Sequence, residues 1–271
     1  MTIEARRSQA AAPVRLISLV PAVTEMLFAL GLGDRVVGVS SFDRFPPEVE
    51  RVPKVGALLD PDVERILSLR PDLVFVYRSQ VDLQTQLGRA KIPVFPYAHA
   101  GLADVTATIR QVGERTRVAD RAEGLARSIE SRIEAIRART RGRPRPRTLV
   151  VFGRDALALR GIYASGGIGF IHDMLIAAGG ENVFADMKRE AVQATTELII
   201  ARRPEVILEL RADPIDPATE AKERRTWAAL SSLPAVRAGR VHIIADPRTV
   251  IPGPRVGEGL EVFARTLHGS R

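Results

Sequence analysis

Short apolar runs alternate with segments of helical spacing over the N-terminal part of the chain. Apolar runs of about four to eight residues between turn residues are typical of buried strands. We predict strands over residues 15–20, 36–39, 73–77 and 92–95, and helices over residues 24–30, 60–69 and 79–89. Strands that alternate with helices of about ten residues indicate βαβ units and therefore a parallel sheet.

Two helical segments, over residues 102–116 and 118–139, interrupt this alternation. The second carries one apolar stripe at helical spacing, formed by Ala122, Leu125, Ile129, Ile133 and Ile136. The prolines that follow Gly142 cannot continue a helix. The alternation then resumes, with predicted strands over residues 148–152, 206–210 and 241–245 and predicted helices over residues 170–178 and 256–267.

This order of elements predicts an α/β fold with two lobes, each built on a parallel central sheet. We expect a disordered tail over residues 1–13, an N-terminal lobe over 14–116, a connecting helix over 117–142 and a C-terminal lobe over 143–271. One long rigid α-helix would join the lobes, with a ligand cleft between them. Because a helix cannot flex as a Gly/Ser linker does, we expect only small rocking between the lobes.

An internal repeat supports the two-lobed prediction. Residues 61–74 align with residues 194–207 at a constant offset of 133, which places Glu64 on Glu197 and Arg70 on Arg203. Each copy is a helix, a proline and an apolar strand, a sequence of elements that any α/β protein can contain. Matching Glu, Arg and Pro at one offset favours a duplication. Small molecules bind at the carboxyl ends of parallel strands and in clefts between domains.

The composition excludes several kinds of site. The chain has 271 residues, of which 45% are hydrophobic, so it can bury a sizeable core. It has no cysteine, which excludes disulfides, thiolate catalysis and cysteine-based zinc sites. No apolar run approaches the roughly 20 residues that span a bilayer. The first 13 residues lack an apolar core, so they do not form a signal peptide as written. Either a leader has been removed or the protein stays inside the cell.

The net charge of +8 is concentrated in one segment. Six arginines alternate with other residues there, at positions 137, 139, 141, 143, 145 and 147. Such a patch could contact anionic lipid or nucleic acid, or could be the solvated end of a helix. No aromatic residues interleave with the arginines to stack on bases, so we expect no nucleic-acid partner.

Motifs of catalysis are missing from the sequence. There is no phosphate loop, no HExxH and no GxSxG motif. The four histidines lie far apart in sequence, and His172 falls inside an apolar helix, where packing is the expected role. His99 follows a predicted strand and is a candidate ligand contact. We therefore predict no catalytic residue, no metal site and no cofactor.

Several aromatic residues fall where predicted strands end, although aromatics make up only 5% of the chain. We place them in loops: Phe42, Phe45, Tyr77, Tyr97 and Tyr163. A loop aromatic that faces a cleft can stack on a flat ligand. The alternative for each is packing in the core.

The ordered motifs of this chain resemble the helical-backbone family of periplasmic binding proteins. The motifs are residues 15–25 (RLISLVPAVTE), 37–47 (VGVSSFDRFPP), 64–74 (ERILSLRPDLV), 179–184 (GGENVF) and 196–204 (TELIIARRP). The similarity extends over nearly the whole chain from Val14. Members of this family deliver cobalamin, haem or ferric siderophores to ABC importers. The resemblance implies a periplasmic or extracytoplasmic monomer that is a binding protein and not an enzyme.

The loop over residues 40–47 is most similar to that of the cobalamin-binding members. The resemblance implies a corrinoid held by aromatic side chains, among them Phe42, Phe45, Tyr77 and Tyr163. Leu58 and Ala191 stand where that group tends to have tryptophans. Haem-binding members usually have a tyrosine ligand just after the glycine that corresponds to Gly56, where this chain has Ala57 and Leu58.

Other ligands and roles remain open at this point. A ferric siderophore could pair with Arg44, Arg78 and Arg154, because guanidinium groups bind anionic complexes well. A metal-chelate enzyme would need a general acid or base, and a cytoplasmic ligand sensor would need no leader.

Glu64 and Glu197 are the candidate docking residues for an ABC permease and its ATPase. The resemblance implies that this pair meets arginines of the membrane subunits. Two charges of one sign on separate lobes can orient docking without contacting the ligand. The alternative is that each carboxylate complements the dipole of its helix, which is worth about 0.3–1 kcal/mol.

Overall fold

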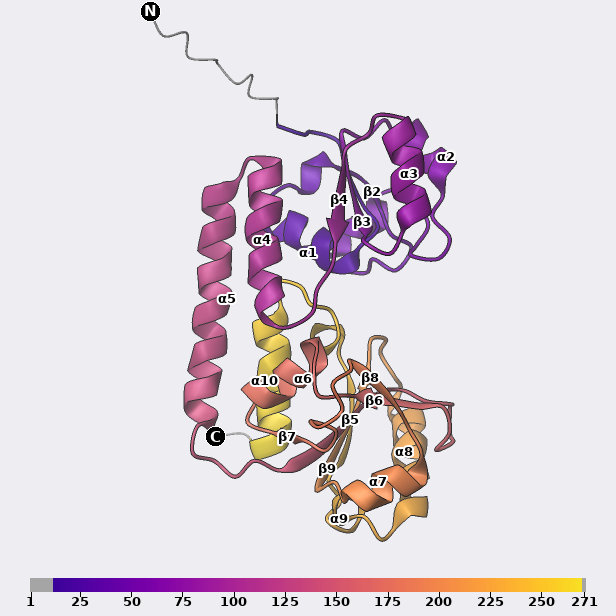
Figure 1. Cartoon of the computed structure of the whole chain (residues 1–271), viewed down its shortest axis with the longest axis vertical. Coiled ribbons are helices and arrows are strands. Elements are labelled where there is room, and N and C mark those ends of the chain that lie inside the picture. Colours follow the sequence, from indigo (N-terminus) through magenta and orange to yellow (C-terminus); the bar gives the residue numbers. More distant parts are fainter. Residues whose placement is uncertain (1–11, 270–271) are drawn as a thin grey trace, which may run out of the picture. The chain divides into compact units, whose positions relative to one another are not determined.

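The computed structural model describes residues 12–269 (Figure 1). The expected disorder of residues 1–13 falls almost entirely outside this range. The described chain divides into two compact units. Unit 1 contains the residues up to Ala98 together with Ile109–Gly124, and unit 2 contains His99–Thr108 and the residues from Leu125 onward. Each α/β unit has its own sheet, as the sequence predicts.

Unit 1 is built on a four-stranded parallel sheet with the order β2-β1-β3-β4. The strands are β1 (Leu16–Ser18), β2 (Val36–Val39), β3 (Leu73–Tyr77) and β4 (Val94–Tyr97). All of β1 and most of β3 are buried, because both strands are central in the sheet. One core cluster joins these strands to side chains of two helices, namely Ile66, Leu83 and Leu87.

The helices of unit 1 are α1 (Pro21–Ala29), α2 (Val63–Ser68) and α3 (Val81–Arg89). Short 3₁₀ turns lie at Gly33–Arg35 and Pro47–Arg51. Helix α1 begins earlier than expected, because Pro21 is well suited to a first helical position. The prediction that α2 begins at Asp60 is wrong. The Asp62 carboxylate accepts a hydrogen bond from the Arg65 amide at 2.9 Å, so Asp62 is the N-cap and the helix begins after it.

Two long helices follow, α4 (Ala103–Thr116) and α5 (Ala119–Thr140), and each contributes residues to both units. The apolar stripe of α5 is buried at Ala122, Ile129, Ile133 and Ile136, while Leu125 is half-buried and Ala126 is buried beside it. The stripe therefore packs as its spacing predicts.

Unit 2 has a six-stranded sheet with the order β10-β9-β5-β6-β8, and β7 pairs with β5. The strands are β5 (Arg147–Gly153), β6 (Ile162–Ser165), β7 (Glu181–Asn182), β8 (Ala191–Ala194), β9 (Val206–Arg211) and β10 (Val241–Ala245). Strands β7, β9 and β10 continue a parallel sheet from β5, whereas β6 runs antiparallel to both of its neighbours, β5 and β8. The connection from β5 to β6 is too short for a parallel crossover, so it joins antiparallel neighbours.

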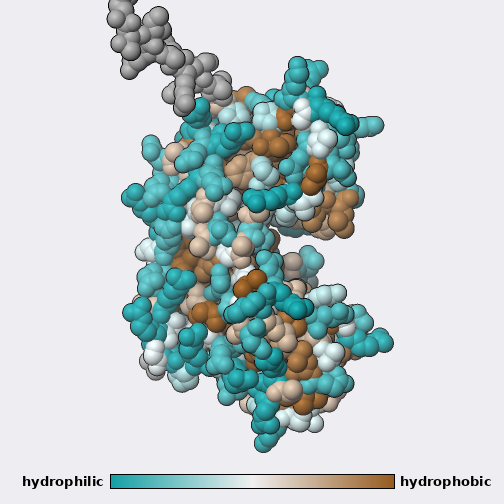
Figure 2. Space-filling view, viewed as in Figure 1, coloured by the Kyte–Doolittle hydropathy of each residue, from teal (hydrophilic) through white to brown (hydrophobic). Residues whose placement is uncertain are grey.

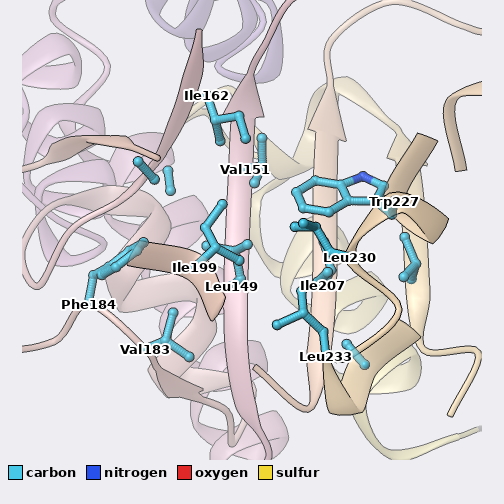
Figure 3. Packing of buried hydrophobic residues seen from close by; sticks show 14 of the residues in the cluster. Leu149, Val151, Ile162, Val183, Phe184, Ile199, Ile207, Trp227, Leu230 and Leu233 are labelled. Carbon is cyan, nitrogen blue, oxygen red and sulfur yellow. The ribbon is translucent and has the colours of Figure 1, made fainter. Parts of the chain in front are cut away.

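The helices of unit 2 are α6 (Phe170–Ala177), α7 (Thr196–Arg202), α8 (Pro217–Thr226), α9 (Pro234–Arg237) and α10 (Val256–His268). 3₁₀ turns lie at Trp227–Leu230 and Pro247–Thr249. The glycine-rich segment before α6 contains Gly169 at positive φ as the N-cap of that helix. The core packs Leu149, Val151, Ile207 and the fully buried Trp227 around the central strands (Figure 3).

The internal repeat is also a repeat of local structure. Thr195 caps α7 as Asp62 caps α2, and both lie at the offset of 133 residues. Arg70 and Arg203 lie just after their helices, and both have positive φ, 47° and 48°.

The arginine at the start of the central strand also has the same role in both units. The Arg15 guanidinium donates to the Leu69 carbonyl at 2.6 Å, and that of Arg147 donates to the Arg202 carbonyl at 2.8 Å. Each arginine therefore caps the carboxyl end of the equivalent helix.

Candidate functional site

In unit 1, the carboxyl ends of neighbouring strands bring two tyrosines together. Tyr77 is the last residue of β3 and Tyr97 is the last residue of β4, and the two are partners in the sheet register. Their ring centroids are 6.0 Å apart with an edge-on angle of 73°. Tyr77 is half-buried and Tyr97 is only 3% exposed. Tyr97 therefore supports the ring of Tyr77, and direct contact of Tyr97 with a ligand stays a prediction.

Three loops at this edge are joined by hydrogen bonds. The Ser41 amide donates to the Gly56 carbonyl at 2.8 Å, which joins the loop after β2 to the loop that contains Gly56. The Gln80 side chain accepts from the Tyr77 amide at 2.9 Å and donates to the Leu58 carbonyl at 3.1 Å. The end of β3 and the two loops thus form one connected face of unit 1.

This face exposes large apolar side chains. Phe42 is 68% exposed, Phe45 40%, Leu58 39% and Leu59 93%. The space-filling view also shows apolar surface on unit 1 (Figure 2). Exposed apolar residues that gather on one face mark interaction sites more often than scattered ones do. We call the loops carrying Phe42, Phe45, Leu58 and Tyr77 the aromatic face of unit 1.

Asp43 lies behind this face and was not singled out by the sequence. It is 1% exposed, and neither carboxylate oxygen has a well-formed hydrogen bond. Burial raises the pKa of Asp43 to about 7, against the opposing effects of Thr24, Ser40 and Lys54. Burial and the nearby Asp43 also raise the pKa of Tyr77. The loop thus carries a carboxyl group that readily takes up a proton near neutral pH.

In unit 2, a cavity of about 580 Å³ lies at the carboxyl ends of β5 and β9. These parallel strands are neighbours in the sheet (Figure 1). The carboxyl ends of parallel strands are the usual place for a ligand in open α/β sheets. The cavity is lined by Gly153 at the end of β5 and Arg154 after it, by Glu209 and Arg211 of β9, and by Asp213 beyond that strand.

Tyr163 stands beside this cavity. It lies within β6 and not in a loop, just as Tyr77 belongs to β3 and Tyr97 to β4, so the prediction of loop positions is wrong for these three tyrosines. Its partner in the sheet register is Gly153, and a side chain at Gly153 would meet the Tyr163 ring at 3.9 Å. Tyr163 is 46% exposed, because strand residues alternate between the two faces of a sheet and its two neighbours are buried. Tyr163 and the cavity form the ligand-facing side of unit 2 in our proposal below.

A buried ionic network forms the wall of the cavity. Arg154 contacts Glu209 at 3.0 Å and Glu223 at 2.6 Å, and all three side chains are 3% exposed or less. Arg211 contacts the same two carboxylates at 2.8 and 3.1 Å. Trp227 donates to Glu209 at 3.0 Å. Burial acts to raise the pKa of Glu223, but hydrogen bonds and the two guanidinium groups hold it below its usual value. The idea that Arg154 pairs with an anionic iron complex is therefore wrong, because its guanidinium group is fully engaged inside the protein.

His99 belongs to unit 2, where its ring packs edge-on against Phe170 with centroids 6.4 Å apart. Burial lowers its pKa, opposed by Glu190 and Asp104. Its contact with a ligand stays a prediction. His172 is half-buried and its Nδ1 lies 3.2 Å from the Asn182 amide nitrogen. Within residues 12–269, no three His, Asp or Glu side chains are grouped so that they could hold a metal ion.

The six arginines at the end of α5 are largely paired within unit 2. Arg139 contacts Glu261 at 2.6 Å and Arg147 contacts Glu181 at 3.2 Å. Arg145 donates to the Gly180 carbonyl at 3.1 Å. Arg137 and Arg141 both contact Glu134. These contacts favour the solvated helix end over a surface dedicated to an anionic partner.

Glu64 and Glu197 are both exposed, and each is the second residue of its helix. Hydrogen bonds from its own backbone amide and from Thr195 and Thr196 lower the pKa of Glu197. The two positions are equivalent in the repeat, but docking to a membrane subunit stays a prediction.

Comparison of this chain with known proteins identifies its family. A family model described as periplasmic binding protein matches residues 16–247. The uncharacterised ABC transporter substrate-binding lipoprotein YvrC of Bacillus subtilis is 32% identical over 263 residues, which cover 94% of this chain and 80% of YvrC. The vitamin B12-binding protein of Salmonella typhimurium is 34% identical over 203 residues, or 73% of this chain and 72% of that protein. The chain therefore belongs to the periplasmic binding protein family.

Solved structures agree on the fold. The vitamin B12-binding protein BtuF of Vibrio cholerae has a TM-score of 0.81 at 22% identity, with 94% of this chain and 97% of that chain covered. The haem-binding protein RhuT of Roseiflexus has a TM-score of 0.79 at 29% identity, with 94% and 99% covered. The names of these two proteins give different ligands, vitamin B12 and haem. No described helix is both long and apolar enough to cross a membrane.

Proposed function

We propose that the chain is the substrate-binding protein of an ABC importer, that it captures a corrinoid such as cobalamin, and that it is not an enzyme. The exposed aromatic residues carry this proposal. Phe42 and Phe45, in the loop after β2 of unit 1, and Tyr163, within β6 of unit 2, each expose 40% or more of their surface. Aromatic rings exposed to water in this way can bury large flat areas of a macrocycle at low entropy cost.

A corrinoid suits these aromatic residues because it brings its own metal and needs no protein ligand for it. Haem is supported by the haem-binding relative, but this chain has Ala57 and Leu58 where a tyrosine ligand is expected. A ferric siderophore is supported less well. Arg154 is buried in ion pairs, and the Arg44 guanidinium donates to the carbonyls of Ser41 and Asp43 in its own loop. Arg44 and Arg78 are both exposed, and of the three arginines considered for that ligand Arg78 is the one whose side chain donates no hydrogen bond within the described residues.

Delivery to the importer would use Glu64 and Glu197. Both carboxylates are exposed at equivalent places of the repeat, and neither lies among the residues of the aromatic face or of the cavity. Such charges can orient docking without affecting the ligand. This role places the protein outside the cytoplasmic membrane.

The test is uptake of radiolabelled cyanocobalamin into proteoliposomes that hold the importer from the same organism. The intact protein should support uptake, and Glu64→Ala with Glu197→Ala should abolish uptake while leaving cyanocobalamin affinity unchanged. The matched control is Glu114→Ala with Glu181→Ala, which removes one exposed glutamate from each unit elsewhere. Normal uptake by the first double variant would refute the docking role. Absence of uptake with the intact protein would refute corrinoid delivery.

A further inference from the structure

We propose that two exposed apolar residues, Leu67 and Ile200, anchor this protein to a membrane permease that contains two copies of one subunit. Each copy would present a basic side chain beside an apolar pocket. The inference rests on the proposed function, because it concerns delivery to the same importer. It adds an apolar contact in each unit to the two glutamates, and it involves neither the aromatic face nor the unit 2 cavity.

The first observation is that two short helices expose the same face. Residues 62–70 around α2 and residues 195–203 around α7 are related by the repeat offset of 133. Their side chains are buried, half-buried or exposed alike at every position but that of Arg65, whose equivalent is half-buried. Ile66 and Ile199 are both fully buried in the cores of their units, so each helix is fixed to its own unit by the equivalent side.

The second observation is an apolar side chain beside an acidic one on each outward face. Leu67 is 40% exposed and Ile200 is 41% exposed. Side chains three positions apart lie on one face of a helix, so Leu67 lies beside Glu64 and Ile200 beside Glu197. Of the large apolar side chains exposed in the described part of the chain, these are the only two related by the repeat offset. A single exposed aliphatic residue is ordinary, but a matched pair beside matched carboxylates indicates a shared partner.

The third observation is that the two carboxylates are available for a partner. Neither Glu64 nor Glu197 forms an ion pair with another described residue. The arginine at the end of α7, Arg202, is itself paired with Asp186 at 2.8 Å. An exposed, unpaired charge accelerates and orients docking, whereas burial of an apolar side chain next to it slows dissociation.

These features specify the chemistry of the partner. A complementary surface carries a basic group for the carboxylate and an apolar pocket for the aliphatic side chain. Since both units offer the same pair of groups, a partner with two identical subunits can meet both units with the same residues. A second copy of this chain is a poorer match, because pairing the equivalent faces would set carboxylate against carboxylate.

The test measures association of the purified chain with the importer from the same organism in nanodiscs, by biolayer interferometry, both without ligand and with cyanocobalamin. Empty nanodiscs are the reference. Leu67→Gln with Ile200→Gln should raise the dissociation rate about thirtyfold or more, as expected for the loss of two partly buried apolar contacts. The apolar exchange Leu67→Ile with Ile200→Leu should remain within about threefold of wild type, because it retains the apolar area. This exchange separates the apolar requirement from a general effect of substitution.

Two further variants serve as controls. Glu64→Ala with Glu197→Ala should mainly lower the association rate and remove most of its dependence on salt, which the glutamine variant should retain. Val14→Gln with Ile176→Gln replaces one exposed aliphatic residue of each unit outside α2 and α7, and should associate as the wild type does.

The outcomes separate the inference from the proposed function. If the wild type associates with the importer but the glutamine variant dissociates at the wild-type rate, the inference is overturned and delivery to the importer stands. If the wild type does not associate under either condition, the proposed function fails and the inference fails with it. Sedimentation velocity tests a second copy of the chain as the partner. A wild-type dimer that becomes monomeric in the glutamine variant would also overturn the inference.

Discussion

Replacement of Asp43 by asparagine should make the protein more stable at neutral pH, by an amount that depends on pH in a defined way. Asp43 is buried among Thr24 and Glu25 of α1, Ser40 of its own loop, Lys54 and Tyr77. Its pKa rises from an ordinary value of 3.8 to about 7 in the folded protein. The folded state therefore holds a proton that the unfolded state has released, and stability falls as the pH rises between these two values.

The magnitude follows from the difference in pKa. A rise of about 3 units, at about 1.36 kcal/mol for each, corresponds to about 4 kcal/mol. Below pH 4 both states are protonated and there is no penalty. Between pH 4 and 7 the penalty grows, and above pH 7 it is complete. Asparagine carries no charge at any of these values. The difference in unfolding free energy between Asp43→Asn and wild type should therefore increase by up to about 4 kcal/mol from pH 4 to pH 8.

The assay is urea unfolding followed by circular dichroism at several pH values over this range. Asp60→Asn, which removes an exposed carboxylate from the same unit, is the control and should show an almost constant difference from wild type. The reasoning is refuted if the Asp43→Asn difference is independent of pH. It is equally refuted if Asp43→Asn loses stability relative to wild type as the pH rises.

Further predictions concern the network and the aromatic residues. Arg154→Met should lower the unfolding free energy by about 3–5 kcal/mol, because Glu209 and Glu223 would stay buried with Arg211 as their remaining cation. A loss below 1 kcal/mol in denaturant unfolding, similar to that of the exposed control Arg224→Met, would show that the network contributes little. Tyr77→Ala and Tyr163→Ala should each weaken cyanocobalamin binding by about 1–3 kcal/mol, as expected for a lost aromatic contact. Unchanged affinity in both would remove the aromatic residues from the site.

The pattern of apolar residues was sufficient to find the central strands and the long helices. The predictions for β2 and β10 agree with the structure at both ends, and α5 differs from its prediction by one residue at each end. Buried parallel strands leave continuous apolar runs, and long helices leave periodic stripes, so both are visible in the sequence. Strands β6 and β8 were missed. They are four residues each, and neither the mostly buried pattern of β6 nor the alternation of β8 extends over enough residues to be recognised.

The candidate site was predicted only in part. The aromatic residues could be found because they fall at strand ends or, for Tyr163, beside one. The Arg–Glu network could not, because Arg154 and its two glutamates are separated by 55 and 69 residues in sequence. No local spacing records such contacts. Asp43 lies in a loop between two exposed aromatic residues, where an exposed carboxylate would be the natural expectation, and its burial depends on the packing of α1 and the neighbouring loops.

Calorimetric titration of the purified chain with cyanocobalamin, haem and a ferric siderophore tests the central proposal most directly. The proposal predicts one-to-one binding of cyanocobalamin that is at least tenfold tighter than binding of either other ligand. Absence of cyanocobalamin binding, together with one-to-one binding of haem or of the siderophore, would contradict it.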